Sequence, residues 1–224
     1  MYNDEIIIDD FASATAIRKM IATGQFSDIQ KVMPKSSYAL LADELRKGHY
    51  VLDLSKFQKE IIYNLRKMSV EEIAQLVDVS EGLENAIKNA ANSSNNLVDF
   101  VNIVKSKRYT QTRIQRILIY ALLGITNSKM LAFKKAVPYA RVLGFNENGK
   151  QLISQIAKKN KKVQIVTSVK KYMDESKNKV LKEMLETDIL ATNVYTLGYE
   201  KDSWSNLDLS LIHISEPTRL QLIS

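Results

Sequence analysis

Apolar side chains recur at helical spacing over most of the 224-residue chain. The clearest case is residues 110–123, where one stripe follows the pattern i, i+3, i+4, i+7 and i+8. Its members are Ile114, Ile117, Leu118, Ala121 and Leu122. The same spacing predicts helices over 13–24, 36–48, 57–68, 97–104, 147–159 and 176–195, and two short helices within 69–91 that break near Ser80 and Gly82.

Small polar residues and glycines mark the ends of several predicted helices. Ser13 is placed to cap the first helix and Gly24 to end it, and Gly48 closes a helix that begins at the serines of 36–37. Ser69 and Glu72 have the spacing of a capping box.

The pattern changes after Pro138. Residues 139–145 and 163–166 are apolar or β-branched, and they flank a helix whose inward face would hold Leu152, Ile153 and Ile156. A strand, a helix and a second strand predict a small parallel β unit. We therefore expect a mainly α fold, with a helical domain followed by a small α/β unit.

Composition narrows the classes of function. The chain has no cysteine, which excludes disulfides and thiolate metal sites, and its two histidines, His49 and His213, are far apart, so we expect no protein-bound metal. We expect His49 to lie at the surface or to be partly buried. No apolar run approaches the roughly 20 residues of a membrane span, and the acidic first residues are not typical of a signal or transit peptide.

Charge is concentrated in the middle of the chain. Residues 101–180 carry 18 basic and 3 acidic side chains, whereas the segments on both sides are net acidic. Such a block favours a polyanionic partner, most commonly nucleic acid, although a solvated lysine-rich surface is the alternative.

The densest basic stretch is KSKRYTQTRIQR, residues 105–116. Its candidate nucleic-acid contacts are Lys105, Lys107, Arg108, Tyr109, Arg113 and Arg116. Five cations and one aromatic ring suit a phosphate backbone with one stacked base. Five phosphate contacts would give a salt slope of roughly −4, so affinity would fall by about two orders of magnitude between 50 and 200 mM salt. An ordinary charged helix start is the competing interpretation.

A second candidate lies near the N-terminus, in the stretch SATAIR. The unpaired N–H groups of a helix start attract phosphate, the hydroxyls of Ser13 and Thr15 add donors, and Arg18 lies one turn further on. Serine caps and surface arginines are also common without any ligand. The stretch resembles the I-S-S-T-x-I-R signature of nucleotidyltransferases that carry an H-I-G-H-like motif, with Ala14 in place of the second serine.

Longer stretches resemble one family, the bacterial tRNA(Met) cytidine acetate ligases. They are YNDEIIIDDFASATAIRK, SVEEIAQLVDVSEGLENAIKNAA, KSKRYTQTRIQRILIYALLGI, ARVLGFNENGKQLI and ETDILATNVYTLGY, and they run in order through most of 2–199. The resemblance implies activation of acetate with Mg-bound ATP to acetyl-adenylate, followed by acetyl transfer to the wobble cytidine of elongator tRNA(Met). It also implies a cytoplasmic enzyme with no membrane partner, and phosphate contacts by Ser13, Thr15 and Arg18.

The H-I-G-H-like loop of the superfamily has no counterpart in this sequence. We therefore expect a C-terminal fragment in which the N-terminal Rossmann-like nucleotidyltransferase domain is largely missing and no catalytic residue is present. The expected parts are the edge of that domain (1–24), a helical tRNA-binding region (25–137), a small α/β region (138–208) and a non-native tail (209–224). The tail contains LSLIHISEPTR, which resembles a translated sequencing adapter.

On this interpretation the chain alone forms no acetyl-adenylate and acetylates no tRNA, and acetate-dependent pyrophosphate exchange would contradict it. Two alternatives stay open, a non-catalytic helical RNA-binding module and a helical protein–protein scaffold.

The basic stretch gives the first testable prediction. If it contacts tRNA, Arg113→Ala/Arg116→Ala weakens binding and flattens the salt dependence in a filter-binding titration. Unchanged affinity and slope would show that another surface binds, and a scaffold would show no salt-dependent affinity at all.

Overall fold

The computed structural model describes residues 12–80, 82–160, 162–201 and 205. Contacts divide this part of the chain into two units, which we describe separately. Of the described residues, unit 1 holds those of 12–56 and 196–201, and unit 2 holds those of 57–195 and residue 205. The tail expected at 209–224, with His213, lies outside the described residues.

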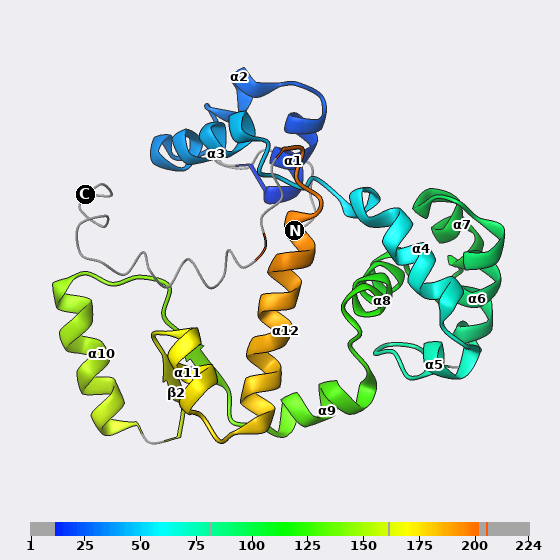
Figure 1. Ribbon diagram of the computed structural model, residues 1–224. Helices are drawn as coiled ribbons and strands as arrows, with labels where there is room; N and C mark the ends of the chain where they lie inside the picture. The colour runs from blue at the N-terminus through cyan, green and yellow to red at the C-terminus, as the bar shows by residue number, and fades with distance from the viewer. Residues whose placement is uncertain (1–11, 81, 161, 202–204, 206–224) are drawn as a thin grey trace. The chain divides into compact units, whose positions relative to one another are not determined.

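Unit 1 begins with a helix whose ends follow the predicted signals. Ser13 accepts a hydrogen bond from the Ala16 backbone N–H (3.1 Å), so it is the N-cap, and Gly24 follows the helix with a φ of 72°. The predicted serine cap of the third helix is wrong, because Pro34 occupies the N-cap position and both serines lie in the first turn. The elements are α1 (Ala14–Ala22), α2 (Phe26–Ile29), α3 (Lys35–Lys47) and the 3-10 turn η1 (Leu54–Phe57), which runs into unit 2 (Figure 1).

Residues 196–201 complete unit 1 through a close backbone contact at Gly48. Gly48 ends α3 with a φ of 78°, and its carbonyl accepts a hydrogen bond from the Glu200 N–H at 2.9 Å. A Cβ atom there would lie 3.1 Å from the backbone nitrogen of Lys201, a tight contact, so a larger residue would have to displace Lys201 slightly as well as adopt the positive φ. Lys56 Nζ adds a 2.5 Å ion pair with Glu200.

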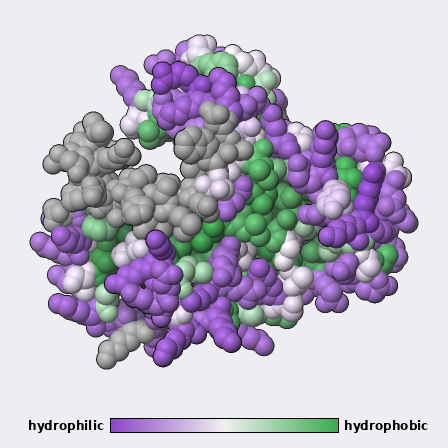
Figure 2. Space-filling view, viewed as in Figure 1, coloured by the Kyte–Doolittle hydropathy of each residue, from purple (hydrophilic) through white to green (hydrophobic). Residues whose placement is uncertain are grey.

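The first part of unit 2 is a bundle of short helices. These are α4 (Gln58–Lys67), α5 (Val70–Ala74), α6 (Leu83–Ser93), α7 (Leu97–Val104), α8 (Gln111–Leu123) and α9 (Asn127–Lys135). α6 packs against α4, α5 and α7, and α8 packs against α4 and α7 (Figure 1). The predicted stripe of α8 is buried except for Leu122, which is half-buried. Figure 2 shows hydrophilic surface with smaller apolar areas at the right of the view, and these helices keep several large apolar side chains exposed, among them Tyr63, Val98 and Leu131.

Two long side chains satisfy the carbonyl groups at the ends of α4 and α6. Lys88, on α6, donates to the carbonyls of Arg66 (2.7 Å) and Met68 (2.5 Å) at the end of α4. In return Arg66, on α4, donates to the carbonyls of Ala91 (2.7 Å) and Ser94 (2.9 Å) at the end of α6. Each helix therefore supplies the cation that caps the other.

The second part of unit 2 contains the parallel pair that the sequence predicts. Its elements are β1 (Tyr139–Arg141), α10 (Glu147–Lys159), β2 (Gln164–Val166), α11 (Val169–Glu175) and α12 (Lys179–Thr196). Tyr139 pairs with Gln164 and Arg141 with Val166. Val166, Val169 and Leu185 form a small core between the strands, α11 and α12.

The predicted burial of α10 is wrong, although its bounds agree with the structure. Leu152 is 56% exposed and Ile156 is 42% exposed, while Ile153 is half-buried. The physical reason is the size of the sheet, because two strands of three residues offer little surface for a 13-residue helix to cover. Within the described ranges, no helix is both long and apolar enough to cross a bilayer.

The reciprocal caps predict a large effect of one substitution. Lys88→Met keeps the aliphatic stem but removes the donors to the α4 carbonyls, so we expect a loss of about 1–3 kcal/mol in the free energy of unfolding. Urea denaturation followed by circular dichroism measures it. The matched control is Lys67→Met on exposed surface of α4, which should change stability by no more than about 0.5 kcal/mol. Equal effects of the two substitutions would contradict a capping role.

Candidate nucleic-acid interface and phosphate site

The candidate interface is built on the turn between α7 and α8. Within it the Ser106 N–H donates to the Tyr109 carbonyl, and the Tyr109 N–H donates to the Ser106 hydroxyl, both at 3.2 Å. Thr110 then caps α8. This closed turn leaves Lys105, Lys107 and Arg108 exposed.

Tyr109 lies beside two guanidinium groups. The Arg113 Cζ is 5.4 Å from the centre of the ring and the Arg108 Cζ is 5.9 Å from it, within the range of cation–π attraction. The ring is half-buried. These contacts fix the ring relative to the start of α8, so it is less available for base stacking than the sequence alone indicates.

Arg113 is bound within the protein. Its Nε and Nη2 donate to the backbone carbonyl of Asp78 at 3.0 and 2.8 Å, and Nη2 also donates to the Ser80 hydroxyl at 2.8 Å. Asp78 has a φ of 67°, in the left-handed region that aspartate tolerates better than most residues. Arg113 therefore fastens the turn after α5 to the start of α8.

Arg116 binds the same aspartate by its side chain. Its Nε lies 3.0 Å from Asp78 Oδ2, and its side chain is 53% exposed. Asp78 thus connects to both arginines, by its carbonyl and by its carboxylate. The structure brings the six predicted contacts together on one turn and the adjoining helix. It also adds two residues that the sequence analysis did not name as contacts, Asp78 and Ser80. The sequence signal that pointed to this region was the expected helix break near Ser80.

The three predicted phosphate contacts lie on the first turns of α1. Thr15 and Arg18 are exposed, and the Ser13 hydroxyl is half-buried and accepts the capping bond described above. The arrangement is compatible with an oxyanion at the helix start, and its binding stays a prediction.

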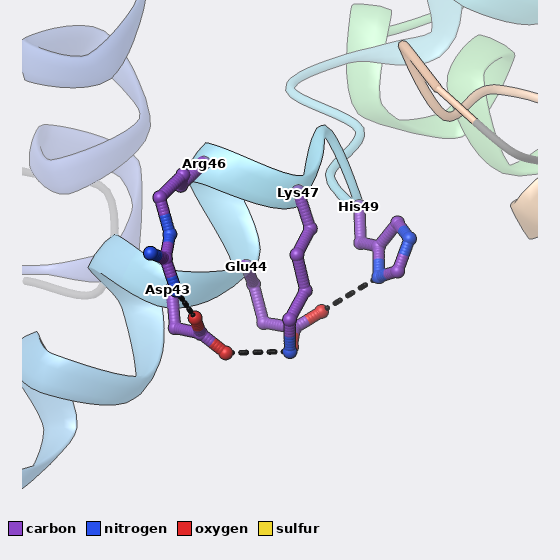
Figure 3. Close-up of polar contacts among 5 residues, drawn as sticks. All are labelled: Asp43, Glu44, Arg46, Lys47 and His49. Carbon is purple, nitrogen blue, oxygen red and sulfur yellow. Dashed lines mark hydrogen bonds and ion pairs between the residues drawn. The ribbon is translucent and has the colours of Figure 1, made fainter.

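A dense set of charges surrounds the end of α3 (Figure 3). Lys47 Nζ lies 2.5 Å from Asp43 Oδ2 and 3.0 Å from Glu44 Oε1, and Arg46 also binds Asp43. The Lys47 hydrogen bond, followed by that of Arg46, lowers the pKa of the Asp43 carboxyl below its ordinary value, and Asp43 in turn raises the pKa of Lys47.

His49 belongs to this charged set and is partly buried, as expected. Its Nδ1 lies 3.1 Å from Glu44 Oε2, and its ring stacks on Tyr199 with centroids 5.1 Å apart. Nowhere in the described ranges do three or more histidine or acidic side chains gather as metal ligands would. The contacts of His49 are those of a structural residue.

Comparison with known proteins identifies the family. A model of the HIGH Nucleotidyl Transferase family matches residues 1–208. The chain belongs to this family. It is also 39% identical over 209 residues to a tRNA(Met) cytidine acetate ligase of Acetivibrio thermocellus, covering 91% of this chain and 50% of that protein. A ligase of the same name from Thermoanaerobacter pseudethanolicus is 38% identical over 208 residues, with 93% and 50% covered. These matches confirm the resemblance seen in the sequence.

Two solved structures have the same fold. Thermotoga maritima TmcAL bound with alpha-thio ATP aligns with a TM-score of 0.82 and 26% identity, over 90% of this chain and 51% of that one. The apo form aligns with a TM-score of 0.85 and 25% identity, over 93% and 52%. The chain spans about half the length of the family members it matches.

The family match corrects the fold class expected from the sequence. A nucleotidyltransferase domain is not largely missing, because the nucleotidyltransferase match extends over residues 1–208 and does not stop near residue 24. The expectation rested on the absence of an H-I-G-H-like loop, and the absence of one short motif carries no information on how far the homology of the rest of the chain extends. For the same reason the match gives no support to the idea that the chain lacks a catalytic core.

The contacts of Arg113 predict a structural effect. Arg113→Ala removes three hydrogen bonds of a half-buried guanidinium, so we expect the free energy of unfolding to fall by about 1–3 kcal/mol. Thermal and urea unfolding measure the change. Lys107→Ala, in the exposed turn, is the matched control and should remain within about 0.5 kcal/mol of the parent chain. A stable Arg113→Ala variant would show that these bonds do not hold the turn.

Proposed function

We propose that the enzyme to which this chain belongs is a tRNA(Met) cytidine acetate ligase. It activates acetate with ATP as acetyl-adenylate and transfers the acetyl group to the wobble cytidine of elongator tRNA(Met) in the cytoplasm. The observation that carries the proposal is 39% and 38% identity to two ligases of this name over more than nine tenths of the chain. An ATP analogue in the Thermotoga maritima neighbour supports ATP as the co-substrate.

We assign tRNA binding to the turn between α7 and α8 and to the exposed edge of α8. The closed turn carries three exposed cations, Lys105, Lys107 and Arg108. Arg116, a few residues later in the sequence, is about half exposed. Such a surface attracts phosphates through counterion release. Arg113 supports this surface from within and is not assigned a phosphate of its own.

We assign phosphate contacts of ATP to Ser13, Thr15 and Arg18. The N-terminus of α1 carries the partial positive charge of a helix start, and an exposed arginine one turn on can bind an oxyanion through two nitrogens. Magnesium would accompany the nucleotide as its counter-ion.

Deleting the reading frame that contains these 224 residues tests the activity in the cell. We expect N4-acetylcytidine to disappear from the wobble position of elongator tRNA(Met), as measured by mass spectrometry of the purified tRNA, and to return when the intact frame is restored. A second complementing copy of the frame carries Arg18→Gln. If Arg18 binds phosphate, this copy should restore at most a tenth of the modification, because losing a charge-assisted contact costs about 1.5–3 kcal/mol. Persistence of the modified nucleoside after deletion would rule out the proposed activity. If tRNA binding remained in that case, the RNA-binding module would be the better interpretation.

A further inference from the structure

We propose that Asp78 sets the RNA affinity of the basic surface by occupying Arg116 in place of a phosphate. The inference rests on the proposed binding of tRNA by the turn between α7 and α8. It assigns to Asp78 a role in setting how many phosphate contacts stable binding requires, in addition to its place in the turn after α5.

The geometry of the pair supports this role. The Asp78 carboxylate accepts a hydrogen bond from Arg116 Nε at 3.0 Å, within the usual range for a guanidinium bound to an oxyanion. Carboxylate and phosphate present similar acceptor oxygens to a guanidinium, so they compete for the same donors. The Arg116 side chain is 53% exposed and that of Asp78 is 34% exposed, so an incoming phosphate can reach the pair.

The carboxylate is held in place by contacts that do not involve its charge. Arg113 binds the backbone carbonyl of Asp78 through two nitrogens, at 3.0 and 2.8 Å, and anchors the Ser80 hydroxyl as well. The turn is therefore fixed whether or not the Asp78 side chain is charged. A competitor fixed in this way remains beside Arg116 and has to be displaced each time a phosphate binds there.

This exchange lowers the affinity of every polyanion that places a phosphate at Arg116 by about the same factor. A ligand that already binds weakly through one or two cations is then released at a lower concentration of salt, whereas an RNA that also places phosphates at Lys105, Lys107 and Arg108 stays bound. The carboxylate thus raises the number of phosphate contacts that stable binding requires.

The substitution Asp78→Asn isolates the charge. Asparagine tolerates a positive φ, and the backbone carbonyl that Arg113 binds is unchanged, so the unfolding midpoint should stay that of the parent chain. In filter binding of unmodified elongator tRNA(Met), we expect affinity at 50 mM salt to rise about two- to fivefold, the range of an exposed ion pair. The salt slope should steepen by roughly 0.7 to 0.9, the value of one further phosphate contact.

Two further variants separate a local effect from general charge. Glu186→Gln removes one negative charge from an exposed position of α12 and should leave the slope unchanged. In an Arg116→Gln background, Asp78→Asn should give no gain, because the donor on which it acts is absent. An equal gain with and without Arg116, or no gain from Asp78→Asn in a chain that binds tRNA, would overturn the role of Asp78.

A different pair of substitutions tests whether the turn binds tRNA at all, independently of Asp78. If Lys107→Gln/Arg108→Gln weakens binding and Asp78→Asn has no effect, tRNA binding by the turn stands and the inference about Asp78 fails. If the parent chain and Asp78→Asn both lack salt-dependent affinity for tRNA, both proposals fail together.

Discussion

Backbone carbonyls at the ends of α4 and α6 impose the constraint on which the helical part of unit 2 depends. The last carbonyls of a helix have no partner within that helix, and these ones are partly buried between packed helices, so donors from the protein stabilise them. Lys88 and Arg66 provide them across the contact between the two helices. With α4 and α6 fixed to each other, α8 packs on α4 and α7 packs on α6, and the basic turn between α7 and α8 is held at both ends.

Local signals in the sequence were reliable where the structure is also local. The capping box of Ser69 and Glu72, the Ser13 cap and the bounds of α10 depend on residues within a few positions of one another, and the structure confirms them. The burial of α10 depends on the area of sheet that is available to cover it. The apolar periodicity of one helix carries no information on that area. The short helices α9 and α11 also escaped prediction, since α9 has no buried residue and α11 buries only Val169, so neither shows a clear apolar stripe.

The candidate site shows the same limit. The density of basic residues predicted that both arginines of α8 bind RNA. In the structure, however, Arg113 donates to the backbone carbonyl of Asp78, which lies 35 positions earlier in the chain. Nothing near Arg113 in the sequence indicates this partner, because the turn at Asp78 is positioned by tertiary packing. The six residues of the interface could therefore be identified from the sequence. Which of them support the surface and which face solvent depends on the tertiary structure.

The return of residues 196–201 to Gly48 has a consequence for the order of folding. The main part of unit 2 is one unbroken segment, residues 57–195, so its core can form on the ribosome as soon as that segment has emerged. Unit 1 is discontinuous, and the ion pair between Lys56 and Glu200 joins positions 144 residues apart. Closing so long a loop is slow unless the intervening chain is already compact. Synthesis from the N-terminus therefore presents the first helices early but completes their unit last, after the intervening unit has shortened the distance to be closed.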